Sequence, residues 1–173
     1  SRINAETALK ESEQLYKKLI ATLPDVITIT NIKGEILFLN DVGIKFSGCK
    51  NFEEVKNKNI MSFIAQEDQE KGIRNFKDAI TKKIGPQEYN FINNNGDKFQ
   101  FEVQREVLKS ADESPYGLIF SMRDITARKK VEIELTQSEE KYRTLIDSIQ
   151  DGVFLIVGGI ISFVNRAFCK IIG

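Results

Sequence analysis

Two segments of the chain, residues 5–23 and 131–149, carry apolar or small side chains at alternating spacings of four and three residues. This spacing is the heptad pattern of a helix that presents one apolar stripe to a partner. Pro24 ends the first predicted helix, because the residue before a proline disfavours the helical conformation. The stripe positions are Ala5, Leu9, Ser12, Tyr16, Leu19 and Leu23 in the first segment and Val131, Leu135, Ser138, Tyr142, Leu145 and Ile149 in the second.

After Pro24 the pattern changes to short runs rich in β-branched residues. Residues 26–39 predict a β-hairpin, and Gly34 can adopt the positive φ that its turn requires. Asn40 or Asp41 can cap a short helix that ends at Gly48.

Helical spacing returns in residues 67–83, after a stretch of short helical turns over residues 52–66. Ile73, Phe76 and Ile80 fall on one predicted face of this helix.

Three strands are predicted in the rest of this region, over residues 88–92, 98–108 and 118–123. The Asn-Gly pair within residues 93–97 is a strong hairpin signal. In the second strand Phe99, Phe101 and Val103 alternate with Gln100, Glu102 and Gln104, which predicts one buried and one wet face. The order of elements predicts an α+β fold, a five-stranded antiparallel sheet with helices packed on one face and flanked by long connector helices.

The chain also contains an internal repeat, since residues 1–25 align without a gap with residues 127–151. Matching pairs are Arg2/Arg128, Glu6/Glu132, Leu9/Leu135, Ser12/Ser138, Glu13/Glu139, Tyr16/Tyr142, Leu19/Leu145, Ile20/Ile146 and Asp25/Asp151. After one deletion, Gly34, Phe38, Asn40 and Gly48 match Gly159, Phe163, Asn165 and Gly173. A repeat of this length suits one whole domain with its connector. We therefore expect a connector helix over residues 1–23, a domain over 24–126, a connector helix over 127–150 and the opening of a second domain over 151–173.

Composition removes several functional classes. The 25 basic and 25 acidic residues cancel, which gives no electrostatic case for nucleic acid or an anionic membrane. The sequence contains no histidine, which excludes histidine-dependent triads and histidine-ligated zinc or haem from this segment. Cys49 and Cys169 form no metal-type cluster, so we expect free thiols in a reducing cytoplasm. No catalytic constellation or nucleotide-binding loop is present, and we expect no enzymatic activity in this segment.

Residues 23–40 (LPDVITITNIKGEILFLN), the FIAQEDQEK stretch, the three-strand end and the closing RDIT together resemble a PAS domain. The resemblance covers residues 24–126 as a complete domain and residues 151–173 as the start of another. It implies a sheet in strand order 2-1-5-4-3, a small internal pocket, and use as a sensor or dimerisation unit in signalling proteins. The tandem arrangement is similar to that of sensor histidine kinases, and a further PAS unit is expected before Ser1. A cyclase or chemotaxis transducer could carry the same module, and a ligand-free structural spacer is the competing function.

The resemblance directs attention to residues that could line the internal pocket. The polar candidates are Thr28, Thr30, Asn40 and Ser121, and the aromatic candidates are Phe99, Phe101 and Phe120. The same polar residues could serve as surface hydroxyls or caps, and the same phenylalanines as ordinary core.

No cofactor is expected. Cys49 lies in SGCKNFEEV rather than in the NCRFLQ-type motif of flavin-binding relatives, and haem-binding relatives usually supply a histidine. A small metabolite remains open as a ligand. Many relatives have HPED where this chain has Ala65-Gln66-Glu67-Asp68, without the histidine and the proline. Glu67 and Asp68 are interpreted as acids favoured by the dipole at the start of a helix.

The output end of the domain carries two further predictions. Either Asp124 or Thr126 can cap the following helix, which would couple the last strand to it as a signal relay. The stripe of Val131, Leu135, Tyr142, Leu145 and Ile149 is expected to pair with a second copy in a homodimer, although packing against the chain's own sheet is an alternative. Ser138 and Tyr142 make this a weak zipper, which suits a switch between two arrangements.

The partners expected for this segment are therefore a second copy and neighbouring PAS units of the same parent chain, with no nucleic acid and no membrane contact. Residues 151–173 would form an isolated apolar hairpin, which is marginal in water. We expect it to pack on another copy of the chain when the rest of its domain is missing.

Overall fold

The computed structural model describes the backbone of residues 2–172 and the side chains of residues 6–172, so the side chain of Ala5 and all of Gly173 lie outside the described residues. The chain divides into two compact units, residues 1–126 and 127–173. Each unit is described by itself.

The first unit begins with helix α1 (Arg2–Thr22), which ends just before Pro24. Strands β1 (Val26–Asn31) and β2 (Ile36–Leu39) form the predicted hairpin, and Gly34 has a φ of 85° in its turn. Three 3₁₀ turns and two helices follow, and then three strands. These elements are α2 (Asp41–Ser47), η1 (Phe52–Glu54), η2 (Ile60–Phe63), η3 (Gln66–Asp68), α3 (Gln69–Thr81), β3 (Gln87–Ile92), β4 (Lys98–Lys109) and β5 (Pro115–Asp124).

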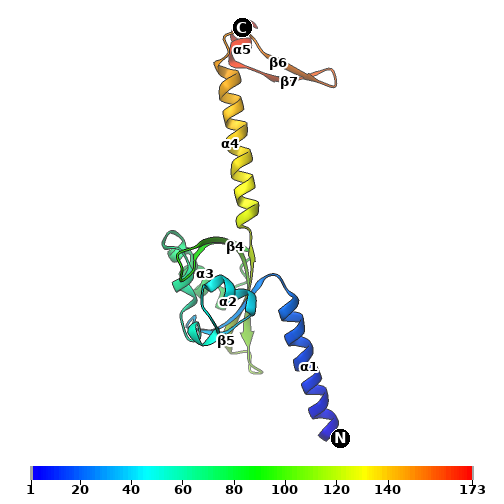
Figure 1. The fold of residues 1–173 in the computed structure, drawn as a ribbon, viewed down its shortest axis with the longest axis vertical. Helices are drawn as coiled ribbons and strands as arrows, with labels where there is room; N and C mark the ends of the chain where they lie inside the picture. The colour runs from blue at the N-terminus through cyan, green and yellow to red at the C-terminus, as the bar shows by residue number, and fades with distance from the viewer. Residues whose placement is uncertain (1, 173) are drawn as a thin grey trace. The chain divides into compact units, whose positions relative to one another are not determined.

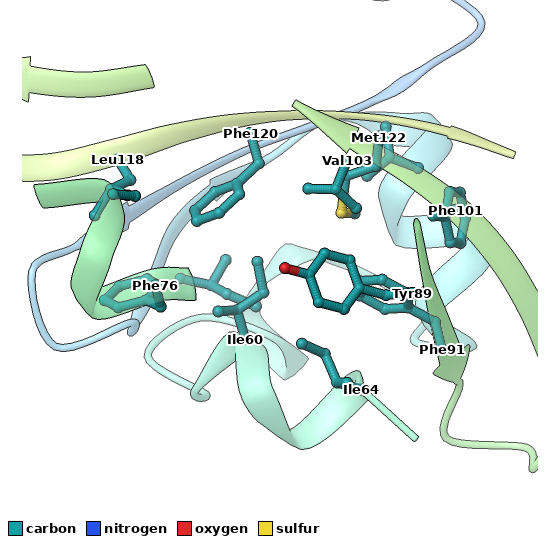
Figure 2. Close-up of a cluster of buried hydrophobic side chains, with 13 residues drawn as sticks. Ile60, Ile64, Phe76, Tyr89, Phe91, Phe101, Val103, Leu118, Phe120 and Met122 are labelled. Carbon is teal, nitrogen blue, oxygen red and sulfur yellow. The ribbon is translucent and has the colours of Figure 1, made fainter. Parts of the chain in front are cut away.

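The five strands form one antiparallel sheet in the order β2-β1-β5-β4-β3, which confirms the expected topology. Helices α2 and α3 pack on the sheet (Figure 1). The hydrophobic core lies between these two layers. Figure 2 shows Phe101, Val103, Phe120 and Met122 pointing from the strands toward Ile60, Ile64 and Phe76 on the helical side.

The buried face of α3 is centred on Phe76 as predicted, but its other buried residues each precede the predicted one by one position. Ile73 is exposed, whereas Gly72, Phe76 and Ala79 are buried. A Cβ at residue 72 would lie 2.8 Å from Cδ1 of Ile64, so glycine lets Ile64 pack against this face of α3 without moving the end of its side chain. The sequence prediction ignored glycine and alanine, because their small side chains carry little hydrophobic signal.

Strand β4 continues the expected alternation as far as residue 105, but a charged residue, Arg105, lies there on its buried face beside Phe101 and Val103. Asp68, expected as a first-turn acid, lies in the first turn of η3 just before α3, and it also accepts hydrogen bonds from the backbone and side-chain nitrogens of Asn90 at 2.7 and 3.1 Å. Asn90 lies on β3, an edge strand of the sheet, so Asp68 satisfies a backbone donor that the sheet leaves unpaired.

The second unit contains most of α4 (Thr126–Ser148), the hairpin of β6 (Phe154–Val157) and β7 (Ile160–Val164), and α5 (Arg166–Ile172). Most apolar side chains of this hairpin are exposed, including Leu155, Ile156, Ile160 and Ile161. The proposal that another copy covers them stays a prediction. Among the described helices of the chain, none has the length and apolar character needed to cross a membrane.

Candidate functional site

A partly open cavity of about 50 Å³ lies between the sheet and the segment from α2 to η2. Three of the predicted pocket residues, Thr28, Phe99 and Phe101, line it. The other residues that line it are Val26, Ile36, Leu39, Gly43, Phe46, Ser47, Ile60, Phe63, Phe91, Ile92, Asn93 and Met122.

The hydroxyls on the cavity wall are already used by the fold. Thr28 Oγ1 donates to the carbonyl of Phe38 at 2.8 Å, and Ser47 Oγ donates to the carbonyl of Ile44 at 2.7 Å. Ser47 Oγ also accepts from the Cys49 amide. The cavity therefore offers a ligand mainly apolar surface, and its walls are also core.

Aromatic rings form much of that surface. The Phe46 ring lies edge-on to Phe99 and Phe101, with ring centroids 4.9 and 5.1 Å apart, and Phe91 lies edge-on to Phe101 at 5.2 Å. Such pairs stabilise a core without any ligand. The positions of these phenylalanines are thus compatible with ordinary core packing and also with lining a ligand pocket.

The other four predicted pocket residues do not line this cavity. Phe120 packs in the core, where its ring stacks on Phe76. Thr30 is fully buried, and its hydroxyl has no partner among the described residues. Ser121 alternates with the buried Phe120 and Met122, which turns it to the other face of the sheet.

Asn40 is buried because it closes the first hairpin. Its Oδ1 accepts from the amides of Ile27 and Gly43 at 3.1 and 3.0 Å, and its Nδ2 donates to the carbonyl of Asp25. It thereby caps α2 and fixes the start of β1 with one side chain. The cap was predicted, but its bonds to β1 were not, because they join residues distant in sequence.

Asn165 makes the same arrangement in the second unit. Its Oδ1 accepts from the amides of Val153 and Phe168 at 2.8 and 2.9 Å, and its Nδ2 donates to the carbonyls of Asp151 and Ile146. The two copies of the internal repeat therefore share these hydrogen bonds as well as their sequence.

The junction between the sheet and α4 contains the two predicted relay residues. Asp124 Oδ1 accepts from the backbone amide and the hydroxyl of Thr126, and Thr126 Oγ1 accepts from the amide of Gln100 at 2.9 Å. The Ile125 amide donates to the carbonyl of Gln100 at 2.8 Å. The chain thus remains bonded to β4 up to the first residue of α4.

Two contacts at this junction were missed by the sequence interpretation. The side chain of Gln100 donates to Asn90 Oδ1 at 3.1 Å, and Asn90 in turn is held by Asp68. A continuous set of hydrogen bonds therefore leads from the start of α3, across β3 and β4, to the start of α4. Gln100 alternates with core residues along β4, and alternation alone assigned it to the wet face.

The second missed contact is an ion pair between Asp25 and Arg123. The Arg123 Nε and Nη2 donate to the two carboxylate oxygens of Asp25 at 3.3 and 3.2 Å. This hydrogen bond and the carboxylate charge raise the pKa of Arg123 above its ordinary value. The pair joins the entry to β1 with the end of β5, and no local sequence signal connects residues so far apart.

Among the described residues, no cluster of acidic or cysteine side chains has the geometry of a metal site.

Comparison with known proteins gives a family for both units. The PAS domain family matches residues 24–127, and a second PAS domain profile matches residues 140–173. Two relatives are sporulation kinases of Bacillus subtilis (strain 168). Sporulation kinase A is 25% identical over 154 residues, and sporulation kinase C is 28% identical over 149 residues. The alignments cover 88% and 77% of this chain but only 25% and 32% of the two kinases, so the chain spans about a third of their length or less.

Solved structures share the fold. The PAS domain of an HTR-like protein from Haloarcula marismortui has a TM-score of 0.59 at 20% identity and covers 70% of this chain and 98% of its own. A sensory box histidine kinase/response regulator from Burkholderia thailandensis has a TM-score of 0.58 at 19% identity, with 75% and 98% covered. The sheet order, the hairpin closed by Asn40 and the match over most of the chain agree, and this chain belongs to the PAS domain family.

Proposed function

We propose that this chain is a sensory and dimerisation module that relays a signal through α4 to an output domain, which is a histidine kinase in the parent protein. The observation that carries the proposal is the bonding of Thr126 and Ile125 to Gln100, which makes α4 continuous with the sheet. A change in the position of β4 would therefore act directly on the first turn of α4. The similarity to sporulation kinases supports a kinase as the output, and the segment itself has no catalytic role in this proposal.

The stripe on α4 supports the dimerisation part. Leu135 and Leu145 are 59% and 53% exposed, and Val131, Tyr142 and Ile149 are exposed as well. On α1, Leu9, Tyr16 and Leu19 repeat the pattern and are also exposed. Such stripes gain stability by pairing, and we assign the stripe on α4 to a homodimer. Because both cysteines are free thiols, we place the module in the cytoplasm.

A ligand-free spacer is the second candidate, and the size of the cavity favours it. A volume of about 50 Å³ holds a few waters, whereas pockets for drug-sized ligands measure roughly 300–1,000 Å³. Haem or flavin would require a large rearrangement of the core, and the proposal therefore includes at most a small metabolite.

We expect the purified protein to be colourless. The apolar cavity is too small for haem or flavin, so no visible absorption band should accompany the protein in stoichiometric amount. Absorption spectroscopy after expression checks this, and native mass spectrometry would detect a small colourless ligand. A stoichiometric band in the visible range would contradict the prediction.

Replacement of Thr126 by valine is expected to loosen the connection between β4 and α4 while the domain stays folded. The Gln100 amide would lose its acceptor, and the loss of about 1 kcal/mol should speed its hydrogen exchange about fivefold. In the full-length parent, Thr126→Val should change kinase autophosphorylation while the dimer remains intact.

Thr144→Val is the matched control, because the Thr144 hydroxyl donates within α4 to the carbonyl of Glu140. It should alter neither the Gln100 amide nor kinase activity. Unchanged autophosphorylation in Thr126→Val, together with faster exchange at Gln100, would favour the spacer over the relay.

A further inference from the structure

A surface groove of about 260 Å³ lies between the C-terminal end of α3 and the C-terminal half of β4, apart from the cavity described above. Its lining carries four basic side chains, Lys82, Lys83, Arg105 and Lys109, and one acidic side chain, Glu106. The remaining lining residues are Ala79, Ile80, Thr81, Ile84 and Val107. The residues that line the groove therefore include more basic than acidic side chains.

Arg105 is the unusual member of this group. Its side chain is buried, with 8% of the residue exposed, and its Nε has no hydrogen-bond partner among the described residues. Nη2 donates to the hydroxyl of Tyr89 at 3.0 Å, and the guanidinium carbon lies 5.5 Å from the centroid of the Tyr89 ring. That hydroxyl also accepts from Asn75 Nδ2 at 2.8 Å. The contacts of Arg105 are thus with a neutral phenol.

The neighbouring carboxylates are paired with the lysines. Asp78 lies 2.9 Å from the Lys82 ammonium, and Glu113 lies 2.9 Å from that of Lys109. Glu106, the acid that lines the groove, lies 4.0 Å from the ammonium of Lys83. These exposed pairs are individually weak, and their lysine side chains are free to rearrange.

A largely buried guanidinium with no ion pair among the described residues is costly, and the cost falls chiefly on its buried Nε. Arginine keeps its proton in proteins, so it cannot become neutral as a buried lysine or carboxyl group does. Burial of an unpaired charge and of an unsatisfied donor both destabilise the fold. An anion next to Arg105 would offset both costs, and the planar guanidinium matches the oxygens of a carboxylate or phosphate.

We propose that this groove binds a small molecule bearing a carboxylate or phosphate group, with Arg105 as its buried anchor and Lys82, Lys83 and Lys109 around it. The groove volume admits a small metabolite rather than a cofactor. Arg105 also borders a cavity of about 20 Å³ in the core, together with Tyr89 and Phe120. An anion held by Arg105 would therefore affect the packing of the core and the position of β4. Gln100, on the same strand, is bonded to Thr126 at the start of α4.

The test is a titration of the whole ¹⁵N-labelled chain with sodium phosphate and, separately, with sodium succinate, with sodium chloride used to keep the ionic strength constant. We expect saturable shifts of the amides of residues 79–84 and 105–109. Arg105→Met, which keeps the length and apolar stem, should weaken binding by about tenfold or more, because a charge-assisted bond is lost. Arg74→Gln changes an exposed arginine of α3 that does not line the groove, and it should bind as the wild type does.

The two probes distinguish the ligand chemistry. Saturation by phosphate alone assigns a phosphate ligand, saturation by succinate alone assigns a carboxylate, and saturation by both assigns a general oxyanion site. The double variant Lys83→Gln with Lys109→Gln changes only exposed side chains, so it stays testable if Arg105→Met does not fold; it should bind about threefold more weakly. The proposal is overturned if neither probe gives saturable shifts, or if folded Arg105→Met or the lysine double variant binds as the wild type does.

Discussion

Replacement of Leu135 and Leu145 by glutamate is expected to convert the dimer into a monomer without lowering the stability of the PAS domain. Both leucines are more than half exposed in the single chain, so the folded monomer loses little when they change. In a symmetric pair the two substitutions remove four leucines from the interface. At about 1.5–3 kcal/mol each, the dissociation constant should rise on the order of 10⁴-fold or more.

Analytical ultracentrifugation over a concentration series measures the dissociation, and circular dichroism measures the melting. The matched control is Ile133→Glu with Thr144→Glu, which places the same two charges on α4 outside the stripe. Both control positions are exposed, and this variant should remain dimeric.

A dimer that survives the Leu135 and Leu145 substitutions would contradict the pairing of α4. The stripe of Leu9, Tyr16 and Leu19 on α1 would then be the next surface to change, because it is the upstream copy of the same pattern.

Asn40→Ala is expected to cause the largest loss of stability of any single polar substitution proposed here. The change leaves the amides of Ile27 and Gly43 without their acceptor in a buried position, and it removes the cap of α2. Loss of the helix cap costs about 1 kcal/mol and the unsatisfied Ile27 amide about 1–3 kcal/mol, so the total should be about 2–4 kcal/mol. For a domain of this size, the melting temperature should fall on the order of 10–20 °C.

Circular dichroism is the suitable measurement, since the chain contains no tryptophan for fluorescence. Asn51→Ala is the control, because Asn51 is exposed and its side chain accepts only a 3.3 Å bond from Glu54 in η1. Asn165→Ala should leave the melting of the first unit unchanged and instead speed hydrogen exchange at Val153 and Phe168. A loss below about 1 kcal/mol in Asn40→Ala would show that water replaces the missing oxygen.

Local sequence signals determined most of the elements and their order. Gly34 and Gly48 adopt the positive φ values expected at a turn and a helix end, and Asn40 caps α2 as predicted. The alternation of Phe99, Phe101 and Val103 predicted the inner face of β4. These signals act between near neighbours, so they can be interpreted without the fold. The strand order followed from the resemblance to PAS domains, because local signals do not specify which strands pair.

Only the tertiary structure decided the contacts that polar residues make with distant parts of the chain. Asn40 faces β1 rather than the cavity, Ser121 lies on the opposite face, and Asp68 pairs with Asn90. Arg105 lies on a buried face that alternation alone would give to an apolar residue. The sequence by itself determined where the strands, turns and helix ends fall, because turn and alternation preferences arise within a few residues. The fold decided three further features: the bonds by which Asn40 closes the first hairpin, the Asp25–Arg123 pair and the basic groove. Each of them joins residues that lie far apart in the chain.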